Sequence, residues 1–183
     1  MDKAFYFSVF YPFQDRVLRV LAELRNVLFR GESGFYLTGG TATSRGYLHH
    51  RFSDDLDLFV NDDSRFGLWA ERVIQALASG TSSLESRSDW HTSVLLRQKR
   101  FVRLTVFERE TSLKIELVND VPAHVGPITY HAVLGRLDSA ENILANKVTA
   151  LIDREEPKDL ADIWGFCYRM KLSIVDAIAE RPL

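Results

Sequence analysis

Apolar residues recur at helical spacing in two stretches of the first half of the chain. In residues 12–30 they share one face of a predicted helix, with Arg, Glu and Asn on the other face, and Gly31 ends the stretch. Residues 64–78 predict a second helix. Two short apolar runs, at 35–37 and 56–60, predict strands. The N-terminal half therefore combines helices and strands.

Runs of β-forming residues fill the middle of the chain, and apolar and polar residues alternate in the last of them. Charged turns separate three such runs, at 91–97, 101–107 and 113–118, and this spacing predicts a meander within one sheet. Helical spacing then returns. The predicted C-terminal helices are 138–153, with Asp138 and Glu141 as a capping box, 158–170, and a short helix opened by Ser173 and Asp176. The pattern predicts a small α/β or α+β sheet domain with a helical cap.

The bulk properties are those of an ordinary globular protein. The chain has 183 residues, of which 46% are hydrophobic and 26% charged, and its net charge is −2. This charge argues against a generally basic nucleic-acid binder but leaves a local basic groove open. No apolar run approaches the roughly 20 residues that a membrane span needs, and the N-terminus lacks the features of a signal peptide. We therefore expect a cytoplasmic protein without a membrane partner.

The segment 35–60 holds the strongest candidate for chemistry. Gly39 and Gly40 follow a predicted strand, and a helix is expected to start at Thr41, where backbone N–H groups would face a phosphate. Asp55 and Asp57 lie two residues apart on the next predicted strand, so both side chains point to one face. Paired carboxylates repel each other unless a cation lies between them.

A third carboxylate would complete a metal site. Glu116 alternates with apolar neighbours on a predicted strand and is the natural candidate, although strand acids are also common on solvated faces. Two Mg²⁺ ions, or Mn²⁺ in their place, would take such oxygen ligands and clamp the attacking and leaving oxygens of a phosphoryl transfer. We therefore predict that Asp55, Asp57 and Glu116 are catalytic metal ligands.

Three motifs give the chain a family resemblance. They are LTGGTA (residues 37–42), SDDLDLF (residues 53–59) and NKVTALIDREEPKDLADIW (residues 146–164). Together they resemble the AbiEii/AbiGii nucleotidyltransferase toxins, within the DNA polymerase beta-like superfamily. The resemblance implies an α+β fold with a small mixed sheet flanked by helices. It also implies a toxin with a cognate antitoxin, and RNA such as tRNA as the acceptor, by analogy alone.

The third motif supplies further candidate residues. Lys147 and Arg154 share a helix face and would reach the phosphates of a nucleoside triphosphate, or else be a solvated Lys and a helix-end Arg. Asp159 and Asp162 would hold these cations in place, or else stabilise a helix N-terminus. Ser44 would touch phosphate through its hydroxyl, or else cap a helix.

We accordingly predict a Mg²⁺-dependent nucleotidyltransferase. Its sheet domain is placed at residues 1–130 and its helical C-terminal part at 131–183, with one domain overall as the alternative. Two other functions stay open. One is a nucleotide-binding regulatory module without turnover, and the other is a transferase that modifies a small molecule such as an antibiotic.

Overall fold

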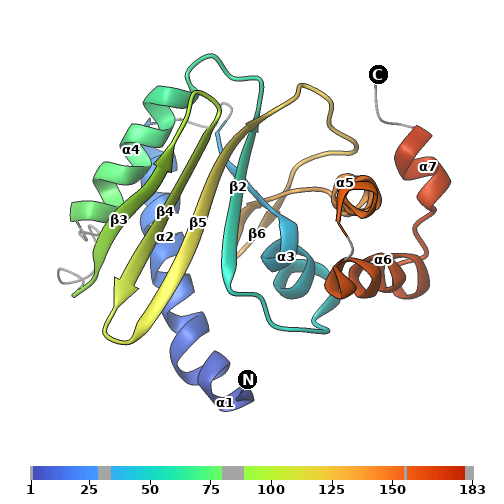
Figure 1. The fold of residues 1–183 in the computed structure, drawn as a ribbon, viewed down its shortest axis with the longest axis horizontal. Coiled ribbons are helices and arrows are strands. Elements are labelled where there is room, and N and C mark those ends of the chain that lie inside the picture. The colour runs from blue at the N-terminus through green and yellow to red at the C-terminus, as the bar shows by residue number, and fades with distance from the viewer. Residues whose placement is uncertain (1, 29–33, 80–88, 155, 180–183) are drawn as a thin grey trace.

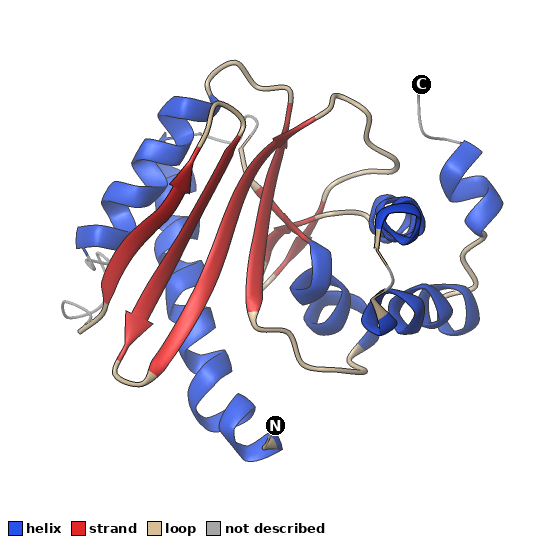
Figure 2. Ribbon diagram, in the orientation of Figure 1, coloured by secondary structure: helices blue, strands red, loops and turns tan. Residues whose placement is uncertain are grey.

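The computed structural model describes residues 2–28, 34–79, 89–154 and 156–179. Its centre is a seven-stranded mixed sheet with the strand order β3-β4-β5-β2-β1-β7-β6. The strands are β1 (Tyr36–Thr38), β2 (Asp55–Asn61), β3 (His91–Arg97), β4 (Phe101–Glu108), β5 (Thr111–Asp120), β6 (Thr129–His131) and β7 (Gly135–Leu137). The α+β class and the mixed sheet are as predicted, and Figure 2 shows helices on both sides of the sheet.

The helices form two groups. They are α1 (Lys3–Phe5), α2 (Tyr11–Leu28), α3 (Gly39–Thr41), α4 (Phe66–Ser79), α5 (Ala140–Asp153), α6 (Pro157–Arg169) and α7 (Ile174–Ala179), with π-helical segments at Tyr6–Phe10 and Ala42–Leu48. In Figure 1, α2 and α4 lie beside the strands β3 and β4, whereas α5, α6 and α7 gather at the opposite side of the molecule. None of the described helices combines the length and hydropathy of a membrane span.

Alternating burial along β5 separates a core face from a polar face. Leu113, Ile115 and Leu117 are fully buried in the core, while Lys114 and Glu116 face the other way. The predicted meander is confirmed, because β3, β4 and β5 pair as antiparallel neighbours. On its other side β5 pairs with β2 in parallel.

Three features differ from the sequence prediction. The first helix extends further toward the N-terminus, since residues from Lys3 onward are helical. The capping box is wrong: Ser139 is the N-cap of α5 and accepts the backbone N–H of Asn142, while Asp138 is buried as a hydrogen-bond acceptor for Thr38. The hairpin β6–β7 was not predicted, because its strands have only three residues each and no clear alternation. This hairpin spans the boundary placed between residues 130 and 131, and the division into two parts stays a prediction.

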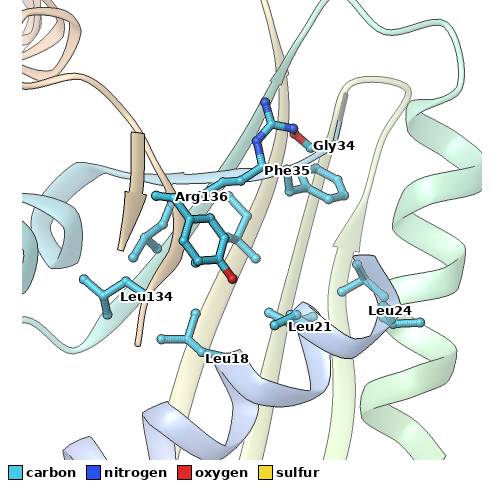
Figure 3. Close-up of a pocket in the computed structure, with 13 residues that line it drawn as sticks. Leu18, Leu21, Leu24, Gly34, Phe35, Leu134 and Arg136 are labelled. Carbon is cyan, nitrogen blue, oxygen red and sulfur yellow. The ribbon is translucent and has the colours of Figure 1, made fainter. Parts of the chain in front are cut away.

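A small apolar cavity of about 70 Å³ lies between α2, β1 and the β6–β7 hairpin. Figure 3 shows Leu18, Leu21 and Leu24 reaching into it from α2, with Leu134 opposite. Its described lining residues include no carboxylate, so it belongs to the packing of the helix on the sheet rather than to the candidate chemistry.

Candidate active site

The three predicted acids lie on adjacent strands. In the parallel pairing of β2 with β5, Asp57 is opposite Glu116. Asp57 is also opposite Thr38, the last residue of β1. Leu56 and its apolar neighbours on β2 are buried, so the acids of β2 face away from the core. The structure therefore brings together Asp55, Asp57 and Glu116, which we call the acid cluster.

Glycine is required where the chain passes the acid cluster. Gly39 has a φ of 65°, which L side chains rarely adopt, and a methyl group there would overlap the carboxylate of Asp57. A methyl group on Gly40 would lie 2.8 Å from the hydroxyl of Ser53. The glycines thus let the start of a helix press directly against the strand that carries the acids.

This helix differs in detail from the prediction. It begins at Gly39 rather than Thr41, and it becomes π-helical from Ala42 onward. Thr41 is fully buried and its hydroxyl donates to the backbone carbonyl of Asp55. Ser44 is buried too, and it lines a separate groove beside Tyr11 rather than the cleft above the acids. Neither Thr41 nor Ser44 lines the cleft above the acids, and the nucleotide contacts expected of them stay predictions.

The acid cluster opens into a polar cleft of about 630 Å³. Figure 1 shows α3 between β2 and the pair α5–α6, and these elements form its walls. The lining residues that carry charge are Arg51, Asp55, Asp57, Lys114, Glu116, Asp120, Lys147, Arg154 and Lys158. Carboxylates on the sheet thus face cations of α5, of α6 and of the loops beside them, across a space large enough for a nucleotide.

Burial and like charges act together on Asp57. Burial raises the pKa of this carboxyl, and the nearby charges of Glu116 and Asp55 raise it further, to about 6. Two cations offset part of this charge: Lys114 Nζ lies 3.0 Å from Asp55 Oδ2, and Arg103 Nε lies 2.9 Å from Glu116 Oε1. The acid cluster is therefore a place where additional positive charge would be stabilised.

The donor atoms of the acid cluster suit a hard divalent cation, which prefers carboxylate oxygens. Within the described ranges, however, no three His, Cys, Asp or Glu side chains already stand as a set of metal ligands. The side chains of Lys114 and Arg103 hold the outer two acids instead. The acids have the right ligand chemistry for a metal and lie on neighbouring strands, but their carboxylates would have to rotate toward the ion.

A second group of charges lies on the opposite wall of the cleft. Lys147 is only 7% exposed, and its Nζ lies 2.6 Å from Asp159 and 2.7 Å from Asp162. Both aspartates are fully buried. Arg51 binds Asp162 through two nitrogens, at 2.8 and 2.7 Å, and Arg154 Nε lies 2.9 Å from Asp159. We call these five residues the salt-bridge cluster.

Comparison with known protein families identifies the family of this chain. A family model described as nucleotidyl transferase AbiEii toxin, Type IV TA system, matches residues 19–176. The chain belongs to this family. It is a nucleotidyltransferase, as the motifs predicted. No curated protein sequence matches the chain.

Solved structures agree on the fold. A candidate nucleotidyltransferase from Helicobacter pylori has a TM-score of 0.62 and 19% identity, over 91% of this chain and 71% of its own. JHP933 from Helicobacter pylori also has a TM-score of 0.62 and 19% identity, over 93% of this chain and 70% of its own. At this identity the likeness shows a shared fold.

The salt-bridge cluster shows how the third motif of this AbiEii-family chain positions its charged residues. Lys147 and Arg154 line the cleft as expected, and Asp159 and Asp162 hold them. Sequence reasoning missed Arg51, because its partner Asp162 lies 111 residues away and no local pattern links the two. It also missed Lys114, although its position two residues before Glu116 on one strand places both side chains on the same face.

Proposed function

We propose that this protein transfers a nucleotide from a nucleoside triphosphate to an acceptor hydroxyl, with release of pyrophosphate, in a reaction that depends on Mg²⁺. The observation that carries this proposal is the placement of Asp57 opposite Glu116 on adjacent strands, with Asp55 on the same face, beside a cleft whose other wall is cationic. Members of such a family generally use a divalent metal. The oxygen-only donor set favours Mg²⁺, with Mn²⁺ as a substitute. We propose two ions because a pair of ions would stabilise both the attacking and the leaving oxygen.

The acid cluster would hold the metal, and Asp57 is its central ligand. A bound divalent ion polarises the α-phosphate and stabilises the charge that develops there. A carboxylate of the acid cluster accepts the proton of the acceptor hydroxyl while the hydroxyl oxygen attacks the α-phosphorus. The new oxygen–phosphorus bond forms while the bond from the α-phosphorus to the bridging oxygen breaks, and pyrophosphate leaves.

The rest of the cleft would position the triphosphate. The backbone N–H groups of Gly39 and Gly40 open a helix beside Asp57, and such groups bind phosphate oxygens. In the salt-bridge cluster three cations face two carboxylates, which leaves one net positive charge near the cleft. Lys147 and Arg154 would stabilise the leaving pyrophosphate through this charge.

The acceptor and partner are proposed from the family. Its description as a Type IV toxin supports an intracellular target and a cognate antitoxin, and we propose RNA such as tRNA as the acceptor, in the cytoplasm. The cleft supports a large acceptor because it is wide and polar.

The test is a transfer assay with each α-³²P-labelled nucleoside triphosphate, Mg²⁺, total bacterial RNA and a pool of small hydroxylated antibiotics. We expect label on RNA with the wild type, and a loss of at least about a thousandfold in Asp57→Asn. Asp62→Asn, beyond the end of β2 and exposed, is the matched control and should keep full activity. Label on the antibiotics alone would contradict an RNA acceptor. Tight nucleotide binding without any transfer would instead favour the regulatory module.

A further inference from the structure

Lys114 occupies an unusual position for a lysine beside a metal site. In the pairing of β2 with β5 it is directly opposite Asp55. Its Nζ lies 3.0 Å from Asp55 Oδ2 and 3.5 Å from Glu116 Oε1, so one ammonium bridges carboxylates from two strands. The side chain is 40% exposed at the edge of the cleft, which gives it room to leave.

The bridge has a direct consequence for metal binding. A metal ion shared by Asp55 and Glu116 would lie close to the carboxylate oxygens that Lys114 now contacts. An ammonium and a divalent ion repel each other at such a distance. The two cations therefore compete for the same carboxylates. Arg103 differs, because it approaches Glu116 from β4 and makes no contact with Asp55 that the structure records.

We propose that Lys114 is a built-in counter-ion that competes with the divalent metal for Asp55 and Glu116, and that an incoming nucleotide draws it away. The triphosphate carries several negative charges into the cleft that Lys114 lines. Its binding favours a swing of the ammonium toward phosphate, which frees Asp55 and leaves Glu116 with Arg103 alone. Metal and nucleotide then bind cooperatively, and the free enzyme holds metal weakly. This inference rests on the proposed function of the cleft as a nucleotide site.

The experiment measures Mn²⁺ binding directly, from the electron paramagnetic resonance signal of free Mn²⁺. The full chain is compared with Lys114→Gln, with and without a non-hydrolysable α,β-methylene nucleoside triphosphate. Without nucleotide, Lys114→Gln should bind Mn²⁺ about five- to tenfold more tightly, the range expected when one partly exposed like charge is removed. The nucleotide should tighten Mn²⁺ binding more in the wild type than in Lys114→Gln.

Two further variants keep the result interpretable. Lys114→Arg retains the charge and should keep the weak Mn²⁺ binding of the wild type. Lys158→Gln removes a lysine that lines the same cleft but contacts Glu156 rather than the acid cluster, and it should change the affinity less than twofold. An unchanged affinity in Lys114→Gln, or no Mn²⁺ binding by any variant, would overturn the proposal. Because binding is measured without turnover, a failure of nucleotidyl transfer is detected separately.

Discussion

The two charged clusters on either side of the cleft shift the pKa of their aspartates in opposite directions. In the salt-bridge cluster, burial raises the pKa of Asp159 and Asp162, but hydrogen bonds and charges from Lys147, Arg51 and Arg154 outweigh it and hold both values below the usual range. In the acid cluster, burial and two like charges raise the pKa of Asp57 to about 6. The carboxylates of the first cluster are fully paired by cations of the chain itself, and those of the second are left short of positive charge.

This difference separates a structural role from a chemical one. Buried carboxylates with full ion pairing stabilise one arrangement of helices, because breaking a pair leaves a charge without a partner. Carboxylates kept close together without enough cations destabilise the fold unless a ligand supplies the missing charge. We infer that the salt-bridge cluster fixes α6 against α5 and the loop before β2, and so holds Lys147 and Arg154 at the cleft, while the acid cluster is reserved for a metal.

The largest effect on stability is expected from Lys147→Met. It removes the shared partner of two fully buried aspartates, so the free energy of unfolding should fall by about 3–5 kcal/mol in urea denaturation. Lys158→Met, on an exposed position of α6, should change it by less than about 0.5 kcal/mol. Similar losses in the two variants would show that the salt-bridge cluster is not structural.

A smaller loss is expected from Gly39→Ala. The positive φ and the overlap with Asp57 together should lower the free energy of unfolding by about 2–4 kcal/mol and displace the acid. Gly135→Ala is matched in backbone, with a φ of 76°, but a methyl group there meets nothing within 4 Å. The free energy of unfolding of Gly135→Ala should fall only by the cost of the positive φ, about 1 kcal/mol. If both variants lost the same free energy of unfolding and Gly39→Ala kept its transfer activity, the close approach of Gly39 to Asp57 would be contradicted.

Asp57→Asn should act in the opposite direction. A carboxyl whose pKa is higher in the folded state, about 6 against 3.8, binds its proton more tightly when folded, so stability falls as the pH rises from about 4 to about 6. Without divalent ions at pH 7, the Asn variant should therefore be more stable than the wild type by about 1–3 kcal/mol. Urea denaturation at pH 4 and pH 7 measures this, and a variant less stable than the wild type at pH 7 would refute it.

The smallest effect is expected from Arg154→Gln. Arg154 is half exposed, and Asp159 keeps its shorter contact with Lys147. Thermal unfolding should show a loss of no more than about 1 kcal/mol. A loss as large as that of Lys147→Met would mean that the exposed and buried cations of the cluster contribute alike.

Much of the fold followed from local patterns. The strand β5 alternates clearly, and the spacing of β3, β4 and β5 between charged turns predicted a meander. The face that Glu116 occupies followed from the alternation in β5, since the buried neighbours determine which way an acid points, whereas its register opposite Asp57 comes from the structure. The short hairpin β6–β7 carries too few residues to show a period, and only its pairing with β1 makes it part of the sheet.

The candidate site was harder to predict where long-range contacts decide it. Asp57, Gly39 and Gly40 lie within one segment, so their proximity could be read from the chain. The burial of Thr41 and the turn of Ser44 away from the cleft depend on a π-helical segment that no spacing indicated. The ion pair of Arg51 with Asp162 forms because α6 packs against the loop before β2, and local sequence patterns do not indicate this contact.

The most direct test of this contrast is the effect of Mg²⁺ on unfolding at pH 7, for the wild type, Asp57→Asn and Arg154→Gln. If the acid cluster binds the metal, 10 mM Mg²⁺ (about tenfold above a millimolar Kd) should stabilise the wild type and Arg154→Gln by about 1–2 kcal/mol. The same Mg²⁺ should leave Asp57→Asn almost unchanged. Equal stabilisation of all three proteins, or of none, would contradict the assignment of Asp57 and its neighbours as the metal site.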